Sequence, residues 1–254
     1  MKVTKLEELE TASLPVTALV YCPAGGGKTS LAGLAAQVYE KRTLFLDVDR
    51  TVPRSLGKLD VVPSVEHIDV TEIDNHSTWE SWTETLRELD EMAKSGALTK
   101  IYDLIVVDNI SELERCILAD FGRQGKNKGV PDQAAYQYMQ FKLINSLRLM
   151  KRWGVNIIWT AWEELEAVSN ADGSQYTRAV PKVNKKIRDN VCGLCDVVGR
   201  IFTNADGVHG VRLESSMNAY AKNQVDSRRG CRVEDFAKWH SKEKKEEQEE
   251  QKND

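Results

Sequence analysis

A glycine-rich turn holds the residues of this 254-residue chain that are best suited to chemistry. It follows an apolar run and leads into a helix-forming stretch, the order that a phosphate-binding P-loop requires. Three successive glycines let backbone N–H groups point at one anion, a lysine neutralises the β and γ phosphates, and a threonine hydroxyl holds Mg²⁺. We expect the nucleotide to be bound by Pro23, Ala24, Gly25, Gly26, Gly27, Lys28, Thr29 and Ser30.

The motif has one departure from its consensus, because Cys22 stands where the first glycine is expected. A chance glycine turn is the alternative interpretation. The combination of strand, turn, Gly27-Lys28-Thr29 and amphipathic helix favours a nucleotide site over that alternative.

Polar residues that end apolar runs supply the next candidates, since ligands of open α/β sheets bind at the carboxyl ends of the strands. Asp108 ends the run 104–107 in the manner of a Walker B aspartate and is expected to hold Mg²⁺ beside Thr29. Its alternative role is the N-cap of the next helix, a role that Asn109 or Ser111 could equally fill.

One further aspartate, Asp49, and one threonine, Thr160, complete the expected catalytic set with Lys28 and Asp108. Asp47 and Asp49 end the strand after the P-loop helix and share a face, so the outer one, Asp49, is the candidate base for the attacking water. A strand-end ion pair with a nearby arginine is its alternative. Thr160 ends another strand and is the candidate γ-phosphate sensor, with Glu163 as a competitor.

The elements that position these residues alternate between buried strands and helices, which indicates an α/β fold with a mainly parallel sheet covered on both faces. Shorter strands at 197–203 and 207–214 are expected to form a hairpin and to add antiparallel strands at one edge. The other expected strands cover 16–21, 42–49, 65–70, 102–108 and 155–160, and the helices 30–40, 77–95, 111–121 and 131–153.

Composition is that of a soluble globular protein, with 41% hydrophobic and 29% charged residues. No apolar run is long enough to cross a bilayer, so we expect a cytoplasmic protein without membrane contact. An odd number of cysteines, five, favours reduced thiols, and Cys192 and Cys195 are expected to be packed thiols rather than a zinc site. The expected domains are an extension (1–15), an ATPase domain (16–240) and a charged, disordered tail (241–254).

Basic residues form two further groups, although a net charge of −4 does not by itself indicate nucleic-acid binding. Lys222 and Arg228 lie far downstream of the P-loop, as do cations that complete a neighbouring subunit's site in oligomeric ATPases. Arg123, Lys126 and Lys128 lie in a glycine-containing loop that could follow a nucleic-acid backbone. Tyr136 and Tyr138 could stack on bases or could be core residues.

With these motifs the chain resembles the phage-encoded nucleotide-binding proteins of the AAA-type, RecA-like group. Some members are described as minimal RecA-like recombinases that promote single-strand annealing. The resemblance runs from about residue 17 to 236 and includes the P-loop, Phe45-Leu-Asp-Val-Asp49, the segment 102–114, Thr160-Ala-Trp-Glu163, the segment 193–200 and Ala219-Tyr-Ala-Lys-Asn-Gln-Val-Asp226.

The resemblance implies a RecA-like core that uses ATP and Mg²⁺. Lys28 and Thr29 match the Walker A roles and Asp108 the Walker B role. Asp49 falls where the group usually has a catalytic glutamate, and the shorter side chain implies slow hydrolysis. Lys222 falls near the lysine that reaches across the subunit interface in filaments.

By analogy with RecA-like folds, DNA-contacting loops follow the Walker B strand and the next one. These loops correspond to 122–130 and 168–181, and the basic residues of the second are Arg178 and Lys182.

The function expected from the sequence is an ATP-hydrolysing RecA-like phage protein that acts on single-stranded DNA in recombination, annealing or replication. It is expected to work as a ring or filament of identical subunits in the host cytoplasm, with a phage annealing protein, a single-strand-binding protein or a helicase as candidate partner. The alternative is an ATPase switch or loader that acts on a protein partner without binding DNA directly. A small-molecule kinase is less favoured, because no basic lid is evident.

Overall fold

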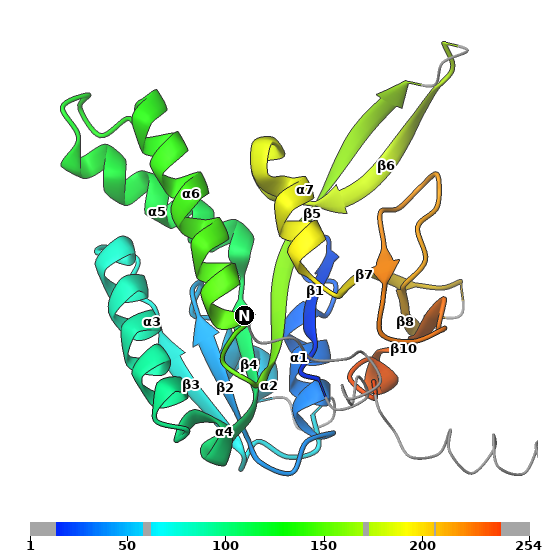
Figure 1. The fold of residues 1–254 in the computed structure, drawn as a ribbon. Coiled ribbons are helices and arrows are strands. Elements are labelled where there is room, and N and C mark those ends of the chain that lie inside the picture. Colours follow the sequence, from blue (N-terminus) through cyan, green and yellow to red (C-terminus); the bar gives the residue numbers. More distant parts are fainter. Residues whose placement is uncertain (1–13, 58–61, 170–172, 206, 240–254) are drawn as a thin grey trace, which may run out of the picture.

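A sheet of ten strands runs through the molecule in the order β10-β8-β7-β1-β5-β4-β2-β3, with β6 paired to β5 and β9 to β7 (Figure 1). The computed structural model describes residues 14–57, 62–169, 173–205 and 207–239, so the charged tail and most of the N-terminal extension lie outside the described residues. Six adjacent strands are parallel: β7 (Val197–Thr203), β1 (Thr17–Cys22), β5 (Asn156–Ser169), β4 (Tyr102–Asp108), β2 (Arg42–Asp47) and β3 (Ile68–Glu72).

Antiparallel strands extend the sheet at the β7 edge, as the sequence predicts. They are β8 (His209–Arg212), β9 (Lys222–Asn223) and β10 (Gly230–Arg232), followed by the 3₁₀ helix η3 (Val233–Asp235). β7 and β8 form the predicted hairpin. The mixed α/β fold with a mainly parallel sheet is therefore confirmed.

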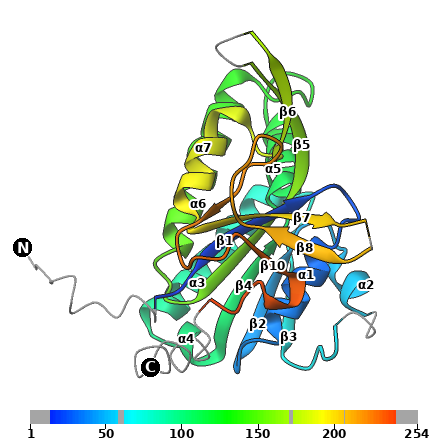
Figure 2. The same ribbon diagram turned by 90° about the vertical axis from the view of Figure 1, so that its right-hand side faces the viewer.

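Helices cover both faces of the sheet, and on each face they pack against the strands to form a separate hydrophobic cluster. One cluster holds residues of α3 (Thr78–Lys94), α4 (Leu98–Ile101), α5 (Ile110–Gln124), α6 (Gln133–Met150) and α7 (Lys185–Leu194). The other holds residues of α1 (Lys28–Ala36), α2 (Val52–Leu56) and the C-terminal segment around Phe236 (Figure 2). Among the described helices, none combines the length and apolar character needed to span a bilayer.

The N-terminus of α3 is held by a side chain of another helix. Ser77 is the N-cap residue, but its side chain makes no capping hydrogen bond. The Asp120 carboxylate of α5 instead accepts the N–H of Trp79 at 3.1 Å. A carboxylate at a helix N-terminus also interacts favourably with the helix dipole, so this contact fastens α3 to α5.

The largest difference from the predicted elements is the length of β5. The sequence predicts a strand that ends at Thr160, whereas β5 continues to Ser169 and pairs antiparallel with β6 (Gln175–Pro181). This β5–β6 hairpin projects beyond the sheet (Figure 1). The hairpin is followed by α7, a helix that the sequence pattern did not predict.

Candidate nucleotide site

The turn between β1 and α1 has the backbone of a phosphate-binding loop. Gly25 and Gly27 have φ angles of 76° and 92°, in the left-handed region that favours glycine. A Cβ on Gly26 would lie 2.6 Å from the Cys22 sulfur, so a side chain there meets the residue that replaces the consensus glycine. Gly27 is the N-cap of α1, and no side chain caps the helix. The N–H groups of its first turn are therefore suited to an anion.

Lys28 is folded into this turn and is only 7% exposed. Its ammonium donates to the carbonyl of Pro23 at 3.2 Å and to that of Cys22 at 3.4 Å. Both acceptors are neutral carbonyls, so the charge is not neutralised by a carboxylate in these contacts. Burial raises the pKa of the Cys22 thiol, and the nearby Lys28 charge opposes that shift.

The Walker B carboxylate is held by two hydroxyls. Thr29 Oγ1 donates to one oxygen of Asp108 at 2.6 Å, and Thr160 Oγ1 donates to the other. Asp108 is 2% exposed and Thr160 is fully buried. These contacts follow from the strand order, because β5 lies between β1 and β4 and places Thr160 beside the carboxyl ends of both strands.

The alternative role of Asp108 as a helix cap is wrong, because its neighbour fills that role. Asn109 is the N-cap of α5, and its side-chain oxygen accepts the N–H of Glu112 at 2.8 Å. Ser111 also has another function: its hydroxyl accepts the N–H of Trp162 at 2.9 Å. Asp108 therefore remains available for a metal.

The two aspartates after β2 have different surroundings. Asp47 is fully buried, and its carboxylate accepts the N–H groups of Thr51 at 3.2 Å and Val52 at 3.1 Å, at the start of α2. Burial raises its pKa to about 6. Asp49 is partly buried and accepts from Asn109 Nδ2 at 2.8 Å and from the Thr51 hydroxyl at 2.9 Å. Burial, and then the charge of Asp108, raise the pKa of Asp49.

These contacts separate a structural aspartate from a candidate base. Asp47 uses both oxygens to hold the backbone of α2, whereas Asp49 lies farther out and is joined to the Walker B strand end through Asn109. The arginine ion pairs in this region go to other carboxylates: Arg42 pairs with Asp69, and Arg50 lies 3.4 Å from Glu72. The role of Asp49 as base remains a prediction.

The donor set fits Mg²⁺ and a nucleotide triphosphate. Mg²⁺ prefers oxygen ligands and is commonly bound by one carboxylate together with substrate phosphates. The Thr29 hydroxyl and the Asp108 carboxylate supply such oxygens 2.6 Å apart, directly beside the open N-terminus of α1. In the part of the chain that the structure describes, no cluster of three His, Cys, Asp or Glu side chains forms an all-protein metal site. Cys192 and Cys195 are buried free thiols.

The two cations predicted to act on a neighbouring subunit are held within their own chain. Lys222 Nζ donates to the carbonyls of Cys195 at 2.7 Å and Gly193 at 3.1 Å, at the end of α7. Arg228 Nε donates to Asp226 at 2.8 Å, and its Nη1 donates to a backbone carbonyl near η3. Both side chains would have to leave these contacts to reach another subunit, and that role stays a prediction.

The predicted DNA-contacting residues lie on two projections at the carboxyl end of the sheet. Lys126 and Lys128 lie in the loop that joins α5 and α6, whereas Arg123 lies in the last turn of α5, and all three are exposed. Arg123 donates to the carbonyl of His76 at 2.7 Å and lies 3.6 Å from Asp120. Arg178 lies on β6, where it donates to the Ser215 hydroxyl at 2.5 Å and stacks 5.1 Å from the Tyr220 ring. Figure 1 shows the loop and the hairpin at the same end of the molecule. Part of the second predicted DNA loop, 170–172, lies outside the described residues.

The sequence suggested Asn109 and Ser111 only as possible helix caps, and their long-range contacts in the site were missed. Besides capping α5, Asn109 holds Asp49, and Ser111 ties α5 to the end of the β5–β1 pairing at Trp162. Their partners are 60 and 51 residues away along the chain. No local pattern reports such pairings, although polar residues directly after a Walker B aspartate are a general signal to examine.

Comparison with known proteins identifies the family. Residues 14–225 match the model of the AAA domain family. No curated protein matches the chain. Among solved structures, the chain is similar to a prototypical ATPase from the type III secretion system of pathogenic bacteria, at 17% identity and a TM-score of 0.45, covering 76% of this chain and 53% of that one.

A second similar structure is the assembled ATPase EscN from the type III secretion system of enteropathogenic E. coli. Identity is 15% and the TM-score is 0.44, with 74% of this chain and 43% of that chain covered. The chain thus spans about half the length of these structures. From the family match over most of its length, the chain belongs to the AAA domain family and is a P-loop ATPase that uses ATP with Mg²⁺.

Proposed function

We propose that this ATPase is a RecA-like phage protein that acts on single-stranded DNA in recombination, annealing or replication, as a ring or filament of identical subunits. The observation that carries the proposal is the continuity of β5. Its Thr160 bonds the Walker B carboxylate, and the same strand continues into the β5–β6 hairpin. One element therefore links the nucleotide site to a projection suited to contact a polymer.

Ser111 strengthens this link at the base of the hairpin. Its hydroxyl accepts the N–H of Trp162 on β5 and donates to the carbonyl of Lys182 after β6, at 2.9 and 2.7 Å. Because Ser111 lies three residues after Asp108, both strands of the hairpin are bound to the segment that follows the Walker B aspartate. A displacement of that segment by the nucleotide would be transmitted to the hairpin.

The side chains of the site have distinct tasks in hydrolysis. The backbone of the P-loop binds phosphate oxygens, and Lys28 places a buried positive charge among them. Thr29 and Asp108 hold Mg²⁺, which neutralises charge on the phosphates when bound. Thr160 orients the Asp108 carboxylate. Asp49 accepts a proton from the attacking water, and Asn109 holds Asp49 in place for this task.

The proposed DNA surface combines cations with aromatic rings. Arg123, at the end of α5, and Lys126 and Lys128, in the α5–α6 loop, would contact phosphates. On α6, Tyr138 is 46% exposed, and its ring makes edge contacts with Phe121 at 5.3 Å and Trp79 at 6.0 Å. The Lys142 ammonium lies 4.9 Å from the ring centre, so a base that stacks on Tyr138 would have to share the ring with this cation or displace it. Tyr136 is 40% exposed.

Binding of labelled oligothymidylate between 50 and 200 mM salt, followed by fluorescence anisotropy, tests this surface. We expect steep salt dependence, and combined Arg123, Lys126 and Lys128 replacement by alanine should reduce the salt slope by about 0.7 per lost phosphate contact. A matched control removes the same charge outside the α5–α6 loop, with Arg87 and Lys94 on α3 and Lys100 on α4 replaced by alanine. Equal binding by both triple variants would remove the loop from the proposal.

The alternative is an ATPase switch or loader for a protein partner, such as an annealing protein, a single-strand-binding protein or a helicase. The exposure of large apolar side chains favours it: Phe141 on α6 is 74% exposed and Leu165 on the hairpin is 65% exposed. This alternative would be supported if DNA bound weakly, with an affinity that does not depend on the salt concentration, and if Phe141→Ser lost binding to the protein partner. A cytoplasmic location and the domain boundaries remain predictions.

A further inference from the structure

Lys182 is fixed at the edge of the nucleotide site by its backbone. It follows the last residue of β6, and its N–H donates to the carbonyl of Trp162 at 2.7 Å. Its own carbonyl accepts from Ser111 Oγ at 2.7 Å. The backbone of Lys182 is therefore bonded both to Ser111, after the Walker B strand, and to Trp162 of β5, which lies two positions beyond the γ-phosphate sensor candidate Thr160.

The strand register places the side chain of Lys182 on the P-loop face. Trp162 is paired with Cys22, and residues paired in register share a face of the sheet. Cys22 packs in the hydrophobic cluster that contains α1 residues such as Leu31. The ammonium of Lys182 lies 5.4 Å from the Trp162 ring, on the same side. A lysine that directly follows β6 thus lies on the face of the sheet that carries the P-loop, beside the carboxyl end of β1 and Trp162 of β5.

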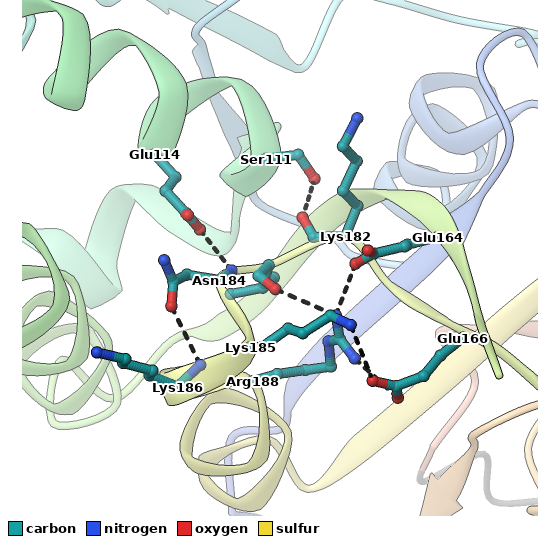
Figure 3. A network of polar contacts seen from close by, with 10 residues as sticks. Ser111, Glu114, Glu164, Glu166, Lys182, Asn184, Lys185, Lys186 and Arg188 are labelled. Atoms are coloured by element: carbon teal, nitrogen blue, oxygen red, sulfur yellow. Dashed lines mark hydrogen bonds and ion pairs between the residues drawn. The ribbon is translucent and has the colours of Figure 1, made fainter. Parts of the chain in front are cut away.

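Lys182 differs from its basic neighbours in the partners of its charged group. Arg188 binds Glu164 at 2.6 Å and Glu166 at 3.1 Å, and Lys185 lies 3.5 Å from Glu166. Figure 3 shows the Lys182 side chain extending away from these pairs. Among the residues that the structure describes, no carboxylate forms an ion pair with Lys182, which is exposed.

We propose that the Lys182 ammonium contacts the γ-phosphate of bound ATP, opposite Lys28, and is thereby a second catalytic cation supplied by the same chain. In hydrolysis, water adds to the γ-phosphorus and the bond to the β–γ bridging oxygen breaks, which gives ADP, inorganic phosphate and a proton. Lys182 forms no covalent bond and transfers no proton; it stabilises negative charge on the transferred group. This assigns Lys182 to the nucleotide rather than to DNA.

Nucleotide binding without DNA tests the assignment. Calorimetric titration of Lys182→Ala with Mg²⁺ and the non-hydrolysable analogue AMP-PNP should show affinity about 10- to 100-fold weaker, as for loss of a charge-assisted hydrogen bond. ADP affinity should change less than about 2-fold, because ADP has no γ-phosphate. Lys182→Arg should restore most of the AMP-PNP affinity.

Lys186→Ala is the matched control, since Lys186 is an equally exposed lysine on the first turn of α7. It should bind both nucleotides as the unaltered protein does. Unchanged AMP-PNP affinity in Lys182→Ala, or equal weakening of AMP-PNP and ADP, would overturn the proposal. Because DNA is absent from these titrations, the outcome is independent of whether the proposed DNA function holds.

Discussion

Asp47 should make the protein less stable as the pH rises from about 4 to 6. Its carboxyl is fully buried beneath the site, and burial raises its pKa from an ordinary value of 3.8 to about 6. Between these pH values the folded state holds a proton that the unfolded chain has released. Folding is therefore favoured below about pH 4, and this contribution is lost as the pH rises through about 6.

The size of the effect follows from the two pKa values. At about 1.4 kcal/mol for each pKa unit, the difference between 3.8 and about 6 corresponds to about 3 kcal/mol of unfolding free energy. Asp47→Asn removes the titration but keeps an oxygen for one of the two N–H donors, Thr51 or Val52. The unfolding free energy of the variant, taken relative to that of the unaltered protein at the same pH, should therefore rise by about 3 kcal/mol between pH 4 and pH 7.

Urea unfolding at four pH values from 4 to 7, followed by tryptophan fluorescence, measures this difference. Other titrating groups cancel when the Asp47→Asn free energy is compared with that of the unaltered protein at the same pH. The reasoning would be refuted if the difference between the two unfolding free energies did not change with pH. It would also be refuted if the variant became less stable, relative to the unaltered protein, as the pH rises.

Three substitutions in the site have sharper consequences for activity. Asp49→Asn should lower kcat about 10²- to 10⁴-fold with little change in nucleotide affinity, and unaltered turnover would exclude Asp49 as the base. Thr160→Val keeps the shape but removes a donor to the Walker B carboxylate, so steady-state kinetics should show a lower kcat that Thr160→Ser restores. Gly26→Ala should weaken ATP binding at least about 10-fold because its Cβ would lie 2.6 Å from the Cys22 sulfur. Cys22→Gly in the same chain should recover part of that affinity, and Gly193→Ala, where a Cβ meets nothing within 4 Å, is the neutral control.

The parts of the fold and site that local patterns encode were predictable. β4 covers 102–108 as expected, because a continuous apolar run ended by Asp108 has one reasonable interpretation. The P-loop was equally clear, since its glycines take the backbone angles that the motif requires. The sequence also offered Asn109 as an alternative cap to Asp108, and Asn109 is the cap of α5, while the metal role of Asp108 stays a prediction.

Features that depend on distant pairing were not predictable. β5 continues past Thr160 through a run rich in glutamate, which has low strand propensity and is held by β6 and by Arg188 from α7. The cap of α3 comes from Asp120, 41 residues from its partner, rather than from the local Ser77. Such contacts arise only once the helices pack on the sheet.

The ATP turnover rate with and without single-stranded DNA tests the central proposal most directly, with Lys28→Ala as the inactive control. The proposal predicts that DNA raises kcat and that the Lys28 variant loses both basal and stimulated turnover. Turnover that depends on Lys28 but does not change with DNA would contradict a DNA-coupled function and favour the protein-partner switch.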